Sequence, residues 1–200
     1  MIYRSYPPLI LASSSRYRVE LLSRLRLPFS AISPDIDESP LSNETPEATA
    51  LRLAQAKALT VAANNPRALV IGSDQVVELH GKPLGKPGNH ANAVRQLSAM
   101  SAQRVLFHTA LCLHNAVTAK SQVENVRTMV TLRTLTDAEI ERYLMLDQPY
   151  DCAGSAKVEC LGITLAESID SSDPTALIGL PLIALMRMLR TEGVTLMDTR

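Results

Sequence analysis

Two acidic residues follow extended, apolar stretches of the sequence and are candidates for binding a metal ion. Asp74 follows the apolar run 68–72 with only Ser73 between, and Glu38 follows the extended stretch 29–36 with only Asp37 between. Open α/β sheets bind ligands just outside the carboxyl ends of their strands. Carboxylates there can bind Mg²⁺ or Mn²⁺, and can also orient or deprotonate a water molecule. Single acids at strand ends are often only turn residues or helix caps, so the prediction depends on the pair and on nearby basic residues.

A cluster of hydroxyl and basic residues follows the first apolar stretch. Ser13, Ser14 and Ser15 precede Arg16 and Arg18, and a helix is expected after them. Serine hydroxyls and free amides at a helix start can hold phosphate oxygens, and arginine adds charge. The glycine-rich P-loop pattern is absent. A plain helix cap with surface arginines stays open as the alternative, because capping serines are common.

Two lysines are further candidates for neutralising phosphate. Lys57 falls on the apolar face of a helix expected over 46–63, where it must either extend to solvent or meet an anion in a cleft. Lys86 lies in a rigid Gly-Lys-Pro turn, but the same tripeptide surrounds Lys82, so spacing alone does not choose between them. Together the basic and acidic candidates suit phosphoryl transfer, in which cations neutralise the phosphate chain and carboxylates serve the metal and water.

The elements that must position these residues alternate unevenly between strands and helices. Strands are expected over 9–11, 29–36, 68–72, 105–113, 126–132 and 163–169, and 76–79 is expected to continue extended after Ser73, Asp74 and Gln75. Helices are expected after Ser15, over 46–63, from Asn89 to about Met100, after the capping box of Thr136 and Glu139, and between Pro181 and Gly193. This order predicts an α/β fold with a mixed sheet flanked by helices, in a single domain over residues 1–200.

The composition excludes several classes of protein. Twenty basic residues balance twenty acidic ones, so no global field attracts nucleic acid or an anionic membrane. No apolar run approaches the length of a membrane span. Cys112, Cys152 and Cys160 lack CxxC spacing, which favours reduced thiols. We therefore expect a cytoplasmic protein that binds neither nucleic acid nor membrane.

Seven stretches, taken in order, resemble the Maf (septum-formation-inhibitor-like) family of nucleotide pyrophosphatases: LILASSSRYRVELL, PDIDES, LRLAQAKA, VIGSDQVV, LGKP, DCAGSAKVE and IGLPL. The resemblance covers nearly the whole chain. It implies an elongated mixed sheet flanked by helices, with two lobes and an active-site cleft, as in inosine-triphosphatase-like folds. The implied activity is metal-dependent cleavage of a nucleoside triphosphate between its α- and β-phosphates.

By position, the resemblance also assigns roles to individual residues. Phosphate binding falls to Ser13, Arg18, Lys57 and Lys86, and metal binding, to Mg²⁺ or Mn²⁺, falls to Glu38 and Asp74. Asp74 would also accept the proton of the attacking water. The family position selects Lys86 over Lys82. The chain departs from the family pattern at Arg16, where proline is usual, and at Val19, where a basic residue is usual; we expect Arg16 to be exposed.

Tyr17, Gln75 and Glu159 occupy positions that distinguish branches of the family, and they resemble the branch that hydrolyses 7-methyl-GTP. N7-methylation makes the base cationic, and stacking on Tyr17 would contribute ~0.5–2 kcal/mol. Glu159 can accept hydrogen bonds from guanine's N1–H and exocyclic amine together, and leaving it desolvated and unpaired costs on the order of 1–3 kcal/mol. The Gln75 amide can turn either way, so neither of its atoms is assigned. Without the family, Tyr17 would be a packing residue and Glu159 a surface acid on a strand.

Two other functions stay open at this point. One is a dTTP or UTP pyrophosphatase of the same family, whose branch carries arginine, threonine and glutamine at the three positions. The other is a non-enzymatic, nucleotide-binding regulator of cell division, which would not need the full set of charged residues. The expected partner in each case is a small nucleotide, and a homodimer stays open.

Overall fold

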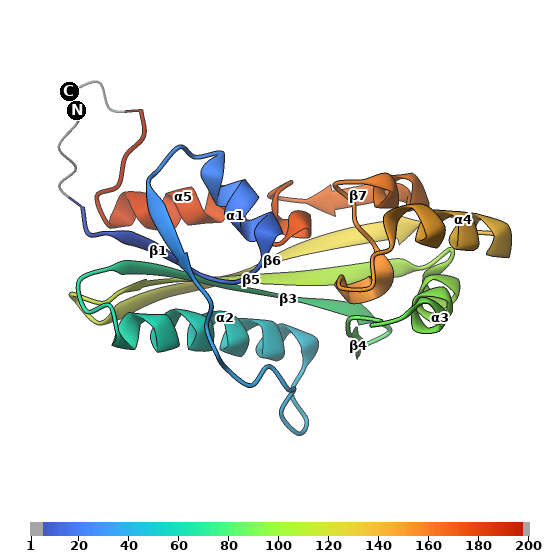
Figure 1. The fold of residues 1–200 in the computed structure, drawn as a ribbon, viewed down its shortest axis with the longest axis horizontal. Helices are drawn as coiled ribbons and strands as arrows, with labels where there is room; N and C mark the ends of the chain where they lie inside the picture. Colours follow the sequence, from blue (N-terminus) through green and yellow to red (C-terminus); the bar gives the residue numbers. More distant parts are fainter. Residues whose placement is uncertain (1–5, 198–200) are drawn as a thin grey trace.

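The computed structural model describes residues 6–197, and these contain one elongated sheet of seven strands (Figure 1). The strands are β1 (Leu9–Ala12), β2 (Phe29–Ile32), β3 (Leu69–Leu79), β4 (Lys82–Leu84), β5 (Arg104–Asn115), β6 (Lys120–Leu132) and β7 (Ala166–Ser171). Their order is β2-β1-β3-β5-β6-β7, and β4 pairs with β3. β1 runs parallel to β2 and β3, and the other pairs are antiparallel. The predicted mixed sheet is confirmed.

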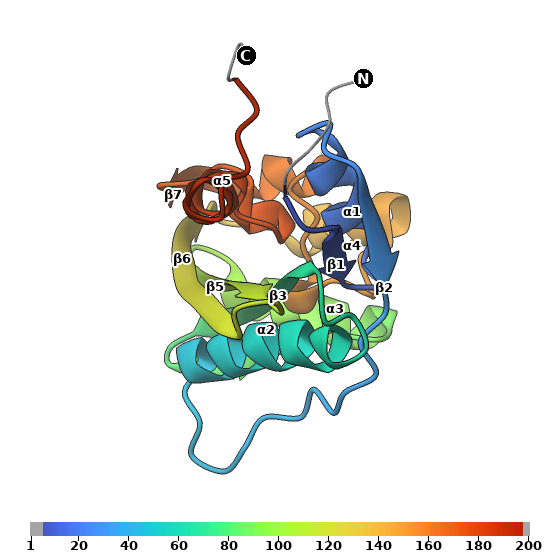
Figure 2. The same ribbon diagram turned by 90° about the vertical axis from the view of Figure 1, so that its left-hand side faces the viewer.

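Helices flank both faces of this sheet. They are α1 (Arg16–Ser23), α2 (Pro46–Ala63), α3 (His90–Met100), α4 (Asp137–Asp147) and α5 (Leu182–Thr191), with 3₁₀ turns η1 (Ala153–Ser155), η2 (Leu161–Leu165) and η3 (Ala176–Ile178). Figures 1 and 2 show α2 along one face and α1 with α5 on the other, while α3 and α4 cover the far end. Within residues 6–197, no helix has both the length and the apolar character that a bilayer span requires.

Alternating strand residues build a core on each face of the sheet. Leu69 and Ile71 of β3 pack in the cluster formed by α1 and α5, whereas Val70 packs in the cluster formed by α2. A third cluster lies under α3 and α4. The elongated molecule therefore has a near lobe, with α1, α2 and α5, and a far lobe, with α3 and α4.

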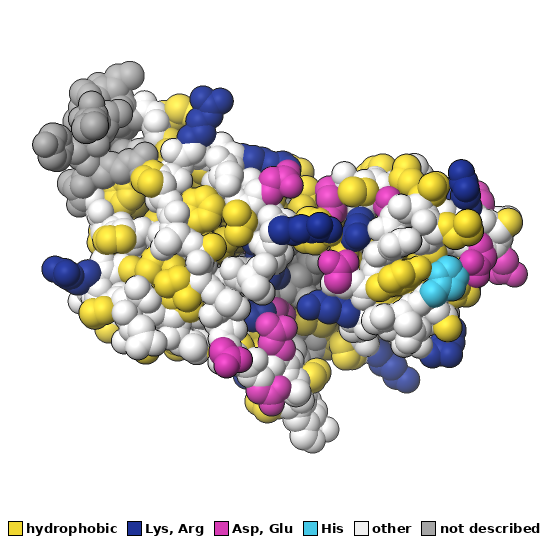
Figure 3. Space-filling view, viewed as in Figure 1, with side chains coloured by type: hydrophobic (Ala, Val, Ile, Leu, Met, Phe, Trp, Pro, Cys, Tyr) yellow, Lys and Arg dark blue, Asp and Glu magenta, His cyan; other side chains and the backbone are white. Residues whose placement is uncertain are grey.

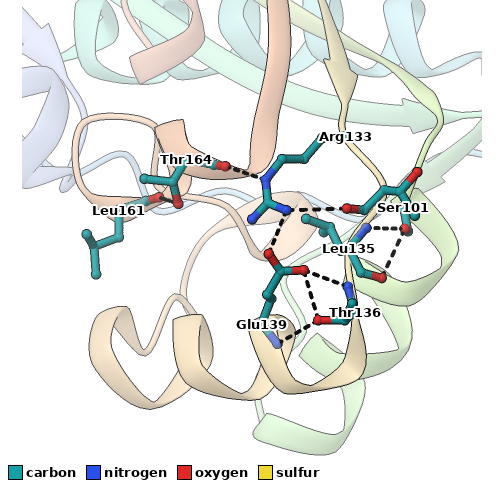
Figure 4. A network of polar contacts seen from close by, with 8 residues as sticks. Ser101, Arg133, Leu135, Thr136, Glu139, Leu161 and Thr164 are labelled. Atoms are coloured by element: carbon teal, nitrogen blue, oxygen red, sulfur yellow. Dashed lines mark hydrogen bonds and ion pairs between the residues drawn. The ribbon is translucent and has the colours of Figure 1, made fainter.

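The helix starts follow the capping residues in the sequence. Thr45 and Asn89 cap α2 and α3, and Thr136 forms the predicted capping box with Glu139. Arg133 extends this box, because its Nη1 donates to Glu139 Oε1 at 2.7 Å and its Nε donates to the η2 carbonyl of Thr164 at 2.8 Å (Figure 4). The start of α4 is thereby tied to η2.

The predicted end of a strand before Asp74 was wrong, because β3 continues unbroken to Leu79. What ends there is its parallel neighbour: Ala12, the last residue of β1, pairs with Gly72. On the same edge of β3, β4 begins to pair only at Val77. The edge between these two partners, over Ser73–Val76, is therefore open, and Asp74 lies in this gap.

Two other expectations need correction. Glu38 does not end an extended run, because β2 stops at Ile32 and Glu38 lies in the irregular segment that follows. The strand expected over 163–169 begins only at Ala166, after η2. The cause is a tight turn in which the Gly162 amide donates to the Lys157 carbonyl at 2.9 Å; a Cβ on Gly162 would lie 2.4 Å from that oxygen.

Helix α2 approaches β3 at Gly72 so closely that no side chain fits between them. A Cβ at Gly72 would lie 2.1 Å from the Ala54 carbonyl oxygen and 2.8 Å from the Ala58 amide nitrogen. Lys57 precedes Ala58 on the buried face of α2. Asp74 shares the face of β3 that carries Gly72, because strand residues two apart point the same way. The close packing thus brings Lys57 to Asp74.

We expect Gly72→Ala to lower the free energy of unfolding by about 3 kcal/mol, because the added methyl group forces α2 away from β3. Chemical denaturation measures this change. Gly85→Ala is the matched control, since a Cβ at Gly85 would meet nothing within 4 Å. Equal stability of the two variants would contradict the close packing described above.

Candidate active site

A cavity of about 810 Å³ lies between the two lobes, a size typical of ligand sites. In Figure 3, basic and acidic side chains gather along the hollow that crosses the middle of this face. All the residues singled out from the sequence line the cavity: Ser13, Tyr17, Arg18, Glu38, Lys57, Asp74, Gln75, Lys86 and Glu159. Lys82, on β4, is not among its lining residues, so the structure separates the two Gly-Lys-Pro turns.

Lys57 is buried between two carboxylates. Its Nζ lies 2.7 Å from Asp74 Oδ1 and 2.6 Å from Glu38 Oε1, and the residue is only 4% exposed. Lys57 therefore meets anions in a cleft instead of extending to solvent, which decides between the two alternatives that its sequence position left open.

The two carboxylates have different environments. Burial raises the pKa of Asp74, and the charges of Lys57 and Arg18 oppose this effect without cancelling it. Desolvation acts on Glu38 in the same direction. There, however, the hydrogen bond from Lys57 and the charges of Lys57, Lys86 and Arg18 outweigh it and lower the pKa. Asp74 is thus a stronger base than an ordinary aspartate, and Glu38 is a weaker base than an ordinary glutamate.

Arg18 is held by the turn that contains the stretch IGLPL. Its Nε donates to the Gly179 carbonyl at 2.8 Å, and the Ser73 hydroxyl lies 3.0 Å from the same oxygen. Gly179 has a φ of 121°, a conformation that favours glycine. Burial lowers the pKa of Arg18, but a guanidinium stays charged. Gly179 and Ser73 are thus positioning residues that pattern reasoning did not identify; the signal was the glycine within IGLPL.

Ser13 and Ser15 have different structural roles. Ser15 is the N-cap of α1, since its Oγ accepts from the Arg18 amide at 3.5 Å, while its own amide donates to Ser13 Oγ at 3.1 Å. The capping alternative therefore holds for Ser15. Ser13 is buried and lines the cavity, and its binding of phosphate stays a prediction.

Arg16 is exposed, as expected, and it covers Tyr17. Its guanidinium carbon lies 4.8 Å from the Tyr17 ring centroid, and its Nη2 donates to the Tyr17 hydroxyl at 2.8 Å. The ring at this end of the cavity therefore already binds a cation through its face.

The segment carrying Glu38 is fixed by Arg52 of α2. The Arg52 guanidinium donates to both carboxylate oxygens of Glu44, at 2.7 and 2.8 Å, and to the Ser39 carbonyl at 3.0 Å. Ser39 is the next residue after Glu38. This explains how an irregular segment can hold Glu38 against Lys57.

Glu159 lies across the cavity in the tight turn that precedes η2. Lys157 anchors this turn to α4, because its amide donates to the Tyr143 hydroxyl at 3.0 Å and its Nζ donates to the Asp147 carbonyl at 3.1 Å. Desolvation raises the pKa of Glu159, and the nearby Lys157 charge opposes that effect. Glu159 is therefore a turn residue and not the strand residue that its alternative interpretation supposed.

The donor atoms fit a divalent cation only in part. Within residues 6–197, no three His, Cys, Asp or Glu side chains form a group that could hold a metal ion. Glu38 and Asp74 provide two carboxylates at one place, held by the same lysine. Mg²⁺ is commonly bound by one or two carboxylates together with substrate phosphates and water. The donor set therefore fits a metal that arrives with a phosphate ligand.

Comparison with known proteins decides the family. The model of the Maf-like protein family matches residues 8–192. This chain belongs to the Maf-like family. The resemblance inferred from the seven sequence stretches is confirmed, and its motifs LILASSSRYRVELL, VIGSDQVV and IGLPL meet around the cavity described above.

Similar proteins within the family share well over half of their residues with this chain. The "7-methyl-GTP pyrophosphatase" of Cupriavidus metallidurans is 59% identical over 187 residues, covering 94% of each chain. The protein of the same name from Burkholderia thailandensis is 59% identical over 198 residues, covering 97% of this chain and 92% of the relative. Among solved structures, the Staphylococcus aureus Ham1 protein matches 62% of this chain and 71% of its own, with 16% identity and a TM-score of 0.45.

We expect Arg52→Gln to raise the pKa of Glu44, which the Arg52 hydrogen bonds hold at about 2. A carboxylate whose pKa is lowered by folding stabilises the fold at any pH above its pKa in the unfolded chain. This contribution is lost as the pH falls toward its pKa in the folded protein. The variant should therefore lose less stability than the native protein between about pH 5 and pH 2. NMR titration of the Glu44 carboxyl and unfolding at neutral and acid pH measure both effects.

Arg24→Gln is the control, because Arg24 pairs with Glu20 on the exposed surface of the molecule. A Glu44 pKa that stays near its native value in Arg52→Gln would show that Arg52 does not hold this segment.

Proposed function

We propose that this chain is a nucleotide pyrophosphatase that hydrolyses 7-methyl-GTP to 7-methyl-GMP and pyrophosphate, and so removes a modified nucleotide. The observation that carries the proposal is the buried Lys57 between Glu38 and Asp74, in a cavity that Arg18 and Lys86 also line. A site with positive charge for phosphates and carboxylates for a cation and water suits a triphosphate. The names of the similar proteins support the same assignment.

The phosphate end of the substrate would lie in the near lobe. Ser13 and Arg18 at the start of α1 would bind phosphate oxygens, with Lys57 behind them and Lys86 reaching in from the far lobe. Glu38 and Asp74 would hold a divalent cation, Mg²⁺ or Mn²⁺, which when bound neutralises charge on the phosphates. Because Lys57 and Arg18 are already held in place by their hydrogen bonds, these charged groups need little reorganisation during the reaction.

Asp74 would act as the general base. A water molecule adds to the α-phosphorus and gives its proton to the Asp74 carboxylate, while the bond from the α-phosphorus to the bridging oxygen breaks and pyrophosphate leaves. Burial raises the pKa of Asp74, which makes its carboxylate a better proton acceptor than an exposed one. Lys57, bonded to Asp74 Oδ1, keeps this carboxylate ionised and oriented before the proton is transferred.

The base would lie between Tyr17 and Glu159, which both line the cavity. The aromatic ring of Tyr17 would stack on the cationic 7-methylated purine through a face that the Arg16 guanidinium does not cover. Glu159, desolvated at the cavity wall, would accept hydrogen bonds from guanine N1–H and the exocyclic amine.

The three cysteines are free, in keeping with a cytoplasmic enzyme.

The first test measures pyrophosphate release from 7-methyl-GTP, GTP, dTTP and UTP, with and without Mg²⁺ or Mn²⁺. We expect metal-dependent release that is fastest with 7-methyl-GTP. Preference for dTTP or UTP would keep the reaction but overturn the base assignment. Nucleotide binding without release from any of the four would favour the regulator of cell division.

Asp74→Asn should lower kcat by at least ~10²-fold, the usual contribution of a general base, while the protein stays folded. The measurement is pyrophosphate release together with a thermal unfolding curve. Asp35→Asn is the control, because Asp35 is exposed and does not line the cavity. Turnover close to native in a folded Asp74→Asn variant would remove Asp74 from the reaction.

A further inference from the structure

Gln75 is bound by a set of acceptors that the mechanism above does not use. Its Nε2 lies 2.9 Å from Thr109 Oγ1, 3.0 Å from the Ala176 carbonyl and 3.1 Å from the Leu177 carbonyl. Thr109 is fully buried on β5, directly opposite Gln75 in the register of the sheet. The two carbonyls belong to η3, so three separate segments meet at one amide.

These contacts determine which end of the amide faces them. Backbone carbonyls only accept hydrogen bonds, so the Gln75 atom within 3.1 Å of two of them must be the NH₂ group. The Thr109 hydroxyl has one hydrogen, which it donates to the Ala176 carbonyl at 2.9 Å. Its oxygen is thus left to accept from Gln75. An amide turned the other way would set Oε1 against two carbonyl oxygens.

The orientation leaves Oε1 as the amide atom available to a ligand, since Gln75 also lines the cavity. Within residues 6–197, no donor makes a hydrogen bond to Gln75 Oε1, whereas the two hydrogens of Nε2 face three acceptors within 3.1 Å. Gln75 therefore presents an acceptor and selects for a donor on the ligand.

We propose that Thr109 is a positioning residue for base selection: together with η3 it holds Gln75 so that Oε1 accepts a hydrogen bond from the exocyclic amine of the guanine base. The amine has two N–H groups. If Glu159 accepts one of them along with N1–H, the second requires another acceptor, and Gln75 Oε1 supplies it. This inference rests on the proposed function, because it takes a guanine nucleotide as the ligand of this cavity.

The test compares 7-methyl-GTP with 7-methyl-ITP, which differ only in the exocyclic amine. Dissociation constants are measured without divalent metal, so that binding is observed whether or not turnover occurs, and kcat/KM is measured with metal. The variants are Thr109→Val, which keeps the shape but removes the hydroxyl; Thr109→Ser, which keeps the hydroxyl; Gln75→Met; and the double variant Gln75→Met with Thr109→Val.

We expect the native protein to prefer 7-methyl-GTP, and Thr109→Val to reduce this preference by about 2- to 10-fold, the typical effect of one hydrogen bond. Thr109→Ser should retain the preference. Gln75→Met should reduce the preference at least as much, to the part that Glu159 still provides, and adding Thr109→Val should then cause no further change, because both residues act through the same bond. If the role of Thr109 were purely structural, Thr109→Val would weaken the binding of both nucleotides equally and leave the preference unchanged.

The proposal is overturned if Gln75→Met keeps the native preference, a result that does not depend on whether Thr109→Val folds. It is also overturned if Thr109→Val lowers the preference as much in the Gln75→Met background as alone. Selective binding without pyrophosphate release would refute the proposed reaction but leave this inference standing. Absence of binding to either nucleotide would overturn both.

Discussion

The contact between α2 and β3 at Gly72 is the constraint on which the candidate site depends. With no side chain between helix and strand, the Ala54 and Ala58 backbone atoms lie directly over the strand. Lys57 is then carried into the protein interior, where a lysine would be strongly unfavourable without anionic partners. Asp74 supplies one partner from the strand and Glu38 supplies the other from an irregular segment. Close packing and charge pairing thus depend on each other.

The charged groups become accessible because the sheet is interrupted at the same place. β1 ends opposite Gly72 and β4 begins opposite Val77, so the edge of β3 is open over Ser73–Val76. Side chains from both faces of β3 therefore reach one cavity. Asp74 points to the α2 side, while Gln75 points to the η3 side. In the proposed function, a single strand in this way supplies groups for the phosphate end and for the base end of the nucleotide.

The turn from η3 to Gly179 links these two ends. The Gly179 carbonyl binds Arg18, and the Ala176 and Leu177 carbonyls bind Gln75. The backbone of one short turn thus orients both Arg18 and Gln75, which the proposed function places at the phosphate end and at the base end. The far lobe adds Lys86 and Glu159 from the other wall, which explains why the cavity requires both lobes.

The amino-acid sequence alone determined the features that depend on neighbouring residues. Thr45, Asn89 and Thr136 cap helices where the pattern predicted, and the buried face of α2 contains Lys57 as its periodicity required. The family motifs contain each of the predicted site residues, and all of these residues line the cavity.

Only the tertiary structure decided how these residues are used, since that depends on pairing between distant segments. Asp74 lies within a strand because β3 stays paired with β5 beyond the end of β1, a fact of register that no local pattern carries. Glu38 depends on Arg52 to reach Lys57. The orientation of the Gln75 amide is set by carbonyls about a hundred residues away in the chain, separated from it by 101 and 102 positions. Such contacts form only when the chain has folded. Which end of the Gln75 amide faces η3 depends on the acceptors that η3 places opposite it, and not on the glutamine residue itself.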